Sequence, residues 1–365
     1  MVLKNNMVPS KRIYSIDLLR FIAAFSVLMF HYTFYGRVSG SNLLEVSDLS
    51  SVSKYGYFGV HLFFMISGFV ILLSIQKNSI TKFIKSRITR LYPAYWFCLL
   101  LTFSFILFFG GNYFKATFSQ FAVNITMFNS FFGIANIDGV YWSLQVEIIF
   151  YFLIFLYLIL NKKFKFITDD GFIYLWLILS FFPFVIDFDS NIILKLTRFI
   201  LIFKYSSFFI AGMLFYKIFK NNKLKYKLLL IPTLFLSILS ALDSINKMSL
   251  DYNSDFSSFV TISLIVSFYV LFYLITTRVL EFINKPIYLK IGLLTYPLYL
   301  IHQVIGYMIF NHFYNLINNY LLLFCVTVLM ISISFYINKF IEIPLSRYIG
   351  SKLNNLSNKR ISELD

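Results

Sequence analysis

The sequence has 365 residues, of which 59% are hydrophobic and only 13% are charged, with a formal net charge of +16 and a mean hydropathy of +0.76. Soluble domains carry about a quarter charged residues, so this composition excludes a soluble globular domain, which would expose apolar surface that it could not cover. A charge of this size in a soluble protein would indicate nucleic-acid binding. Here the basic residues lie in short segments between apolar runs, which is typical of membrane topology. We therefore expect a multi-pass membrane protein that lies in the lipid bilayer and binds no nucleic acid.

The chain has two cysteines, Cys98 and Cys325, and both lie inside apolar runs. This predicts no disulfide framework, and no metal-ligand spacing is present, so we expect no metal. The first apolar run contains Asp17 and Arg20 and lacks a small-residue cleavage site. It is therefore not expected to be a cleavable signal peptide.

Apolar runs of about 20 residues recur along the chain, and each is long enough to cross the hydrocarbon core as a helix. The sequence predicts an all-α fold with about ten transmembrane helices, near residues 13–35, 57–76, 91–110, 141–160, 172–187, 198–218, 228–243, 259–277, 288–311 and 319–341. A cytoplasmic N-terminal segment, an acyl-chain-length transmembrane domain and a cytoplasmic polar tail are then expected over residues 1–12, 13–341 and 342–365.

Lysines and arginines alternate between basic and nearly neutral connecting segments. The segments 77–90 and 217–227 are rich in them, whereas 36–56 and 111–140 hold few and 312–318 holds none. By the positive-inside rule, the basic segments and both termini are cytoplasmic. The alternation stays in phase along the chain, so we expect neither an extra nor a missing helix.

The first helix, in DLLRFIAAFSVLMFHYTF, carries polar residues that are costly in lipid. Arg20 and His31 are eleven residues apart, which on a helix is three turns plus about 20°, and about 16 Å of rise. The two side chains therefore share one face, and Asp17 lies on the same stripe. Such a stripe is expected to face protein or water rather than lipid.

Three more polar residues, His61, Glu147 and His302, fall in the predicted outer halves of their helices, close to the depth of His31. A carboxylate inside a membrane helix is rare unless it is partnered or functional. His31 and Glu147 are therefore the strongest candidates for chemistry. His61 and His302 remain open between a functional role and that of ordinary interfacial residues.

The basic segment ITKFIKSRITRLYP places Arg87 and Arg90 three residues apart, so that they are neighbours on a helix. Pro93 is expected to open the following span at its first turn. Two adjacent guanidiniums suit a phosphorylated ligand. Plain positive-inside charge, or contact with anionic lipid, explains the same segment equally well.

Five motifs follow one another along the chain. Arg20 and His31 form the pattern R-x10-H. The other four are FFMISGFVI (Phe63 to Ile71), RITRLYPAYW (Arg87 to Trp96), WSLQVEIIFY (Trp142 to Tyr151) and TYPLYLIHQ (Thr295 to Gln303). In this order they resemble the motifs of the acyltransferase 3 family of integral membrane acyltransferases, and the resemblance covers nearly the whole chain.

The resemblance implies transfer of an acyl group, usually acetyl, from coenzyme A to a hydroxyl, most often of a carbohydrate. In bacteria such acceptors are cell-surface or exported glycans, among them lipopolysaccharide, which places the protein in the inner (plasma) membrane. The chain looks like a stand-alone member without a fused esterase domain. We expect no permanently bound cofactor, with acetyl-CoA or another acyl-CoA as the donor substrate.

The resemblance also implies roles for single residues. Arg20, Arg87 and Arg90 would bind the donor phosphates by charge-assisted hydrogen bonds. His31 would act as a general base on the acceptor hydroxyl or carry the acyl group itself. Glu147 would orient His31 or stabilise its charged form.

Contacts to the substrates are expected from six further residues, which are His61, Ser67, Trp142, Ser143, Tyr299 and His302. The pair Ser67-Gly68 is better suited to close helix packing than to nucleophilic attack. A proton-coupled transporter is the competing function, although no inverted repeat supports it, and a non-catalytic component of polysaccharide export is a third. The acyl group, the acceptor sugar and the oligomeric state do not follow from the sequence.

Overall fold

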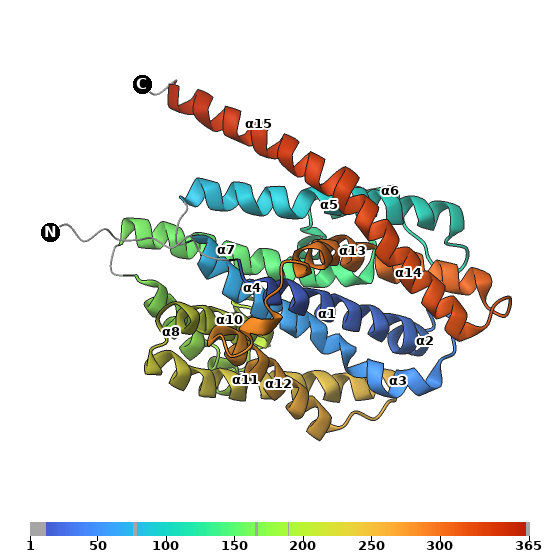
Figure 1. The fold of residues 1–365 in the computed structure, drawn as a ribbon, viewed down its shortest axis with the longest axis horizontal. Coiled ribbons are helices and arrows are strands. Elements are labelled where there is room, and N and C mark those ends of the chain that lie inside the picture. The colour runs from blue at the N-terminus through green and yellow to red at the C-terminus, as the bar shows by residue number, and fades with distance from the viewer. Residues whose placement is uncertain (1–11, 76–78, 165–166, 189, 363–365) are drawn as a thin grey trace.

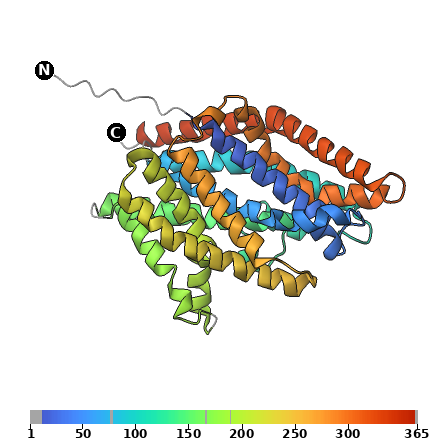
Figure 2. The same cartoon turned by 60° about the horizontal axis from the view of Figure 1, so that its bottom comes forward.

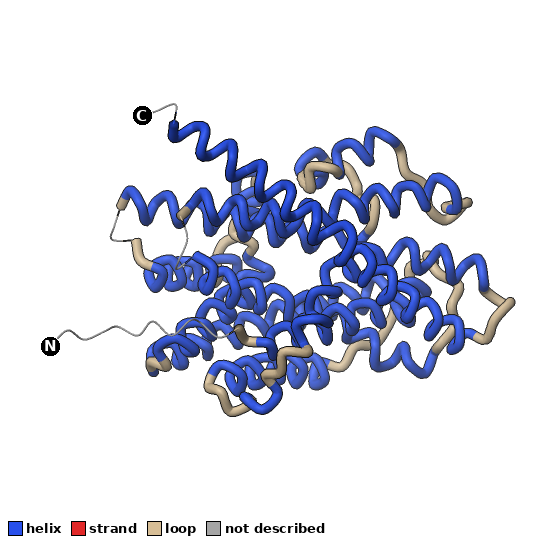
Figure 3. Tube along the Cα trace, turned by 45° about the horizontal axis from the view of Figure 1, so that its top comes forward, coloured by secondary structure: helices blue, strands red, loops and turns tan. Residues whose placement is uncertain are grey.

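A computed structural model describes residues 12–75, 79–164, 167–188 and 190–362. Every regular element in these residues is a helix, which confirms the predicted all-α membrane fold. The long helices form one bundle whose length runs across Figure 1, and Figure 3 shows them joined by loops. Of the two predicted terminal segments, residues 1–11 and 363–365 lie outside the described residues.

The α-helices α1 to α7 are Tyr14–Phe30, Gly36–Val38, Ser47–Ser53, Gly59–Ile75, Ile80–Phe109, Phe118–Asn124 and Trp142–Lys163. Helices α8 to α15 are Asp169–Leu179, Ile192–Ile200, Phe203–Asn221, Leu224–Tyr252, Ser258–Thr276, Tyr288–Phe313, Asn319–Ile337 and Ile343–Ser362. The π-helical segments η1 and η7 are His31–Tyr35 and Asn338–Glu342. The 3₁₀ segments η2 to η6 are Lys54–Phe58, Asn129–Phe132, Gly139–Tyr141, Phe182–Phe184 and Glu281–Ile283.

Nine helices in the described parts of the chain are long and apolar enough to cross a membrane, and they match nine of the ten predicted spans. The prediction of a full helix over 172–187 is wrong. In its place α8 has 11 residues, about 16 Å of rise, against roughly 30 Å of hydrocarbon. The helix ends at Ser180, whose hydroxyl bonds back to the carbonyl of Trp176 at 2.7 Å, and Pro183 follows in a 3₁₀ turn.

Although α8 is short, it still connects two levels of its neighbour α10. At its start, Asp169 accepts a hydrogen bond from the Lys217 ammonium at 2.8 Å, and after its end the hydroxyl of Ser180 lies 2.7 Å from that of Ser206. The chain therefore runs antiparallel to α10 here, as the predicted alternation requires. Which end of the bundle is cytoplasmic stays a prediction.

Helix α5 begins eleven residues before the predicted span, at Ile80, because Ser79 caps it by accepting the backbone N–H of Lys82. The prediction that Pro93 opens this helix is therefore wrong, and Pro93 lies inside it. A proline leaves the carbonyl four residues earlier without its helical donor. Here the hydroxyl of Ser346 donates to that carbonyl, of Thr89, at 2.6 Å, which docks the start of α15 on α5.

Helices α4 and α10 pack closely through glycines. A Cβ atom on Gly68 would lie 2.0 Å from the carbonyl oxygen of Phe209, and one on Gly212 would lie 1.9 Å from that of Met65. Such close approach of two backbones needs residues without a side chain. Gly68 therefore has the packing role expected of the Ser67-Gly68 pair, whereas the neighbouring Ser67 lines a cavity.

Candidate active site

Three cavities lie one after another along the bundle. The central cavity, of about 590 Å³, is lined by residues of α1, α4, α5, α7 and α13. The histidine-side cavity, of about 900 Å³, contains His31 and shares Val60 and Tyr299 with the central cavity. The arginine-side cavity, of about 880 Å³, shares Arg20 and Arg90 with it. These shared walls place the three cavities in sequence between the two ends of the R-x10-H motif.

His31 stands where α1 passes into the π-helical segment η1, and π segments inside helices are frequent at functional sites. Two tyrosines fix this point against α13. The hydroxyl of Tyr32 donates to the carbonyl of His302 at 2.9 Å, and that of Tyr307 donates to the carbonyl of His31 at 3.1 Å. A Cβ on Gly306 would lie 2.5 Å from the Tyr32 hydroxyl, so this glycine makes room for the contact.

The imidazoles of His31 and His302 are hydrogen-bonded to each other. Nε2 of His302 lies 3.0 Å from Nδ1 of His31, while Nδ1 of His302 lies 2.9 Å from the carbonyl oxygen of Tyr299. A carbonyl only accepts, so the neutral His302 carries its proton on Nδ1 and accepts at Nε2. His31 then carries its proton on Nδ1, and its Nε2 keeps a lone pair. Because His31 lines the histidine-side cavity, this arrangement suits a base that acts there.

Glu147 lies in the central cavity, not beside His31. It accepts hydrogen bonds from the hydroxyls of Ser67, at 2.7 Å, and Tyr151. No hydrogen bond joins it to His31 within the described residues. The orienting contact that we expected from Glu147 is made by His302, and a part for Glu147 in catalysis stays a prediction.

The three motif arginines have different surroundings. Arg20 lines the central and arginine-side cavities and donates to Asp17 at 2.9 Å, as expected for residues on one stripe. Arg90 lines the same two cavities. Arg87 instead lies over the ring of Tyr151, 5.2 Å from its centroid. Two of the three arginines are therefore in place to meet a ligand inside the bundle, and the third supports the wall behind Glu147.

Comparison with known proteins agrees with this geometry. The family model of the acyltransferase 3 domain, described as an acyltransferase domain, matches residues 13–339. The chain belongs to the acyltransferase 3 family. None of the curated proteins and none of the solved structures compared with the chain matches it. All five motifs of this membrane acyltransferase contribute side chains to the three cavities.

The other expected substrate contacts of the acyltransferase separate into two groups. Ser143 and Tyr299 line the central cavity, where their hydroxyls lie 2.7 Å apart, and Trp142 lines the histidine-side cavity. His61 lies elsewhere, fully buried among aromatic rings, the nearest of which is Phe208 at 4.8 Å between centroids. Neither ring nitrogen of His61 has a hydrogen-bond partner among the described residues.

Sequence reasoning missed two polar residues next to the histidine pair. Asp138 is fully buried and accepts the backbone N–H groups of Val140 and Val304, both at 3.1 Å. It thereby ties the start of α7 to α13 close to His302. Gln303 lines the histidine-side cavity, and its carbonyl oxygen is buried without a partner in the described structure. Asp138-Gly139 is visible in the sequence as a turn signal, but the contact with α13 is not.

Among the residues that the structure describes, no group of three or more His, Cys, Asp or Glu side chains is arranged to hold a metal ion. The chemistry of the site must therefore be considered first in terms of imidazole, hydroxyl, guanidinium and carboxylate groups.

Proposed function

We propose that this membrane acyltransferase is an O-acyltransferase that moves an acyl group, most often acetyl, from acyl-CoA to a hydroxyl of a cell-surface or exported carbohydrate. The observation that carries the proposal is the sequence of cavities, with arginines at one end and His31 at the other. A charged donor enters at the arginine end, and its thioester reaches the histidine end. The bundle lies in the plasma (inner) membrane, with the arginine end cytoplasmic.

The length of the path supports an acyl-CoA donor. From Arg20 to His31 the helix rises about 16 Å over eleven residues. The pantetheine arm contains two amides and their linkers, and extended peptide-like chain of four to five residues covers about the same length. Arg20 and Arg90 hold the phosphates, and Ser67, Ser143 and Tyr299 offer hydroxyls to the amides along the central cavity.

The transfer then follows from the histidine pair. Nε2 of His31 takes the proton of the acceptor hydroxyl while that oxygen attacks the thioester carbonyl carbon. The carbon–sulfur bond breaks, and the leaving thiolate takes the proton back from His31. His302 positions His31, because its Nε2 accepts the Nδ1–H of His31 and keeps accepting it when His31 is charged. Transfer through an acyl group on His31 remains the alternative route.

The acceptor occupies the histidine-side cavity. Its wall includes the aromatic rings of Tyr35, Tyr57, Trp142 and Tyr252, and aromatic faces are suitable surfaces for the apolar side of a sugar ring. The unpartnered carbonyl oxygen of Gln303 offers an acceptor for a sugar hydroxyl.

Two measurements test the function. Purified protein in lipid vesicles should release free CoA thiol from acetyl-CoA when an acceptor glycan is added, which neither a transporter nor a structural component of polysaccharide export would do. Mass spectrometry of surface glycans from cells with and without the gene should show the loss of one acyl substituent. If neither thioester consumption nor a glycan difference is found, the proposal is wrong.

A further inference from the structure

The arginine-side cavity has a composition that the motif residues alone do not explain. Its wall contains Arg12 in addition to Arg20 and Arg90, and Asp17 is the one carboxylate among its described lining residues. Asp17 accepts hydrogen bonds from both Arg12, at 3.0 Å, and Arg20, at 2.9 Å. One carboxylate therefore serves two guanidiniums, and this part of the wall keeps a positive charge.

The wall also has one aromatic ring that carries a cation of its own. Phe219, near the end of α10, lines the cavity, and the guanidinium of Arg278 lies over its ring at 5.6 Å from the centroid. Arg278 belongs to the turn after α12 and has a φ of 64°, a left-handed value that few residues other than glycine adopt. Such a backbone persists only where the surroundings determine it.

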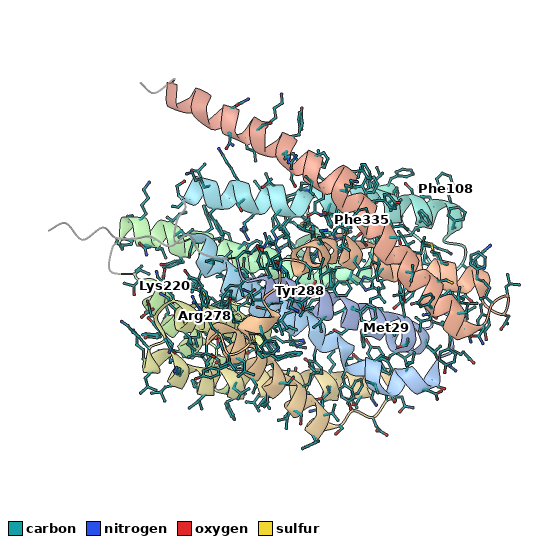
Figure 4. The ribbon with its side chains drawn as sticks, viewed as in Figure 1. Met29, Phe108, Lys220, Arg278, Tyr288 and Phe335 are labelled. Atoms are coloured by element: carbon teal, nitrogen blue, oxygen red, sulfur yellow. The ribbon has the colours of Figure 1, made fainter. Side chains whose placement is uncertain are left out.

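Arg278 lies at the outer rim of this cavity. Its side chain is exposed, and no ion pair involves it among the described residues. Figure 4 shows Arg278 and Lys220 at the same end of the bundle, whereas Phe108 lies at the other. A charged group that enters the cavity from this end passes Arg278 before it reaches Arg20.

Negative groups on the far side of the cavity do not cancel this charge. Glu147 and Glu342 act electrostatically on Arg90, the lining residue that is shared with the central cavity. Arg12 and Arg278 lie on the α1 and α12 side, where Asp17 is the carboxylate that the cavity wall provides.

We infer that the arginine-side cavity is the binding site for the phosphorylated adenosine part of the donor, and that Arg12 and Arg278 hold its phosphates beside the ring of Phe219. The inference rests on the proposed function for the identity of the donor. Guanidiniums pair with phosphate oxygens through two hydrogen bonds. The ring of Phe219 offers a surface on which adenine stacks. The diphosphate then leads toward Arg20 and Arg90, where the pantetheine arm begins.

Binding of adenosine 3′,5′-bisphosphate to the full-length protein tests this site without any thioester. The protein is placed in nanodiscs of phosphatidylcholine alone, and calorimetry gives the dissociation constant. Arg278→Ala should raise it about tenfold or more, since one charge-assisted contact is lost. Arg278→Lys should restore part of the affinity. Arg347→Ala, which removes an exposed arginine of α15, serves as the matched control and should leave the constant unchanged.

Donor kinetics provide the second arm. Arg278→Ala should raise the KM for acetyl-CoA about tenfold and leave the KM for acetyl-pantetheine, which has no phosphate, unchanged. Equal effects on both donors, or no effect on nucleotide binding, overturn the inference while acyl transfer by the wild-type protein still stands. Nucleotide binding that depends on Arg278 in a protein that consumes no thioester has the opposite meaning, since the site exists and the proposed function fails. If the effect appears only in nanodiscs with anionic lipid, Arg278 binds lipid headgroups and the inference is wrong.

Discussion

The two ends of the cavity sequence are held together by different forces. At the histidine end, His31, His302, Tyr32 and Tyr307 form uncharged hydrogen bonds between α1 and α13. At the arginine end, Asp17 is shared by two arginines. The first arrangement uses nearly all of its donors and acceptors within the protein, and the second has cationic groups in excess.

This difference indicates a division of work. Hydrogen bonds that are satisfied inside a low-dielectric bundle fix geometry, and an unsatisfied partner there is costly. A site with spare guanidiniums is instead suited to a ligand that brings negative charge. The histidine end is therefore built to hold a reacting group in one position, and the arginine end is built to receive a charged molecule.

The widest test of the comparison asks on which sides of the membrane the two ends lie. Cysteines introduced at Lys223 and Asn112, in a chain whose Cys98 and Cys325 are replaced, should react with a membrane-impermeant thiol reagent from opposite sides. In intact cells only the cysteine at position 112 should be labelled, because Lys223 lies in a basic segment. Labelling of both positions would refute the predicted topology.

The largest effect on the reaction is expected at His31. His31→Ala removes the base that faces the histidine-side cavity, so transfer should fall by about 10²- to 10⁴-fold, the usual contribution of general acid–base catalysis. Initial rates of CoA thiol release, at equal membrane levels of protein, measure it. Glu147→Gln keeps the shape of the side chain and should cost less. Retention of more than about a tenth of wild-type activity in His31→Ala would remove His31 from the mechanism.

At the arginine end, Arg90→Ala should raise the KM for acyl-CoA roughly ten- to a hundredfold with little change in kcat, because a charge-assisted hydrogen bond is lost. Arg87→Ala should have a smaller effect, since Arg87 lies over the Tyr151 ring. Steady-state kinetics with varied donor separate the two. Unchanged KM in both variants would leave these arginines with a topological role alone.

A positioning residue should show a smaller effect than the base that it positions. His302→Ala removes the acceptor for the Nδ1–H of His31, and loss of one neutral hydrogen bond, about 1 kcal/mol, corresponds to a five- to tenfold lower kcat. His302→Gln can still accept through its amide oxygen and should restore part of the rate. The pH profile of kcat should shift in His302→Ala. An unchanged profile would show that His302 only packs beside His31.

The sequence predicted most of the fold and part of the site, and the reasons are visible in particular residues. Helix spacing placed Asp17, Arg20 and His31 on one stripe, and all three line the cavities. It could not tell that His31 pairs with His302 rather than Glu147, because depth along a helix does not determine which helix packs beside it. That depends on the fit of side chains between α1 and α13, such as Tyr32 against Gly306.

Prolines illustrate a second limit. Pro93, Pro232 and Pro297 lie inside long helices, whereas Pro183 follows the early end of α8. A proline leaves one carbonyl without its donor, and membrane helices tolerate it where a neighbour satisfies that carbonyl. The partner of Thr89 comes from Ser346, far away in the sequence. Local sequence therefore cannot decide between a helix that continues and one that ends.

The smallest expected effect concerns the ion pairs where α8, α10 and α11 meet. Asp170 accepts hydrogen bonds from the ammonium groups of Lys225, at 2.6 Å, and Lys217, at 3.1 Å. Burial alone would raise the pKa of Asp170, but the hydrogen bonds from Lys225, Lys217 and Tyr226 lower it below its usual value. A lowered pKa means that the ionised carboxylate stabilises the folded protein at neutral pH. That contribution is lost as the pH falls through the lowered pKa.

Asp170→Asn should therefore lower the Tm of the detergent-solubilised protein at pH 7. The loss should be small, within about 1 kcal/mol, because these groups are partly exposed and water screens them. The difference in Tm between the variant and the wild type should shrink below about pH 4, where the carboxylate of the unfolded chain is already protonated. A difference that stays constant between pH 7 and pH 3 would show that shape rather than charge is responsible, and the arginine end would then owe less of its stability to ion pairs than the structure indicates.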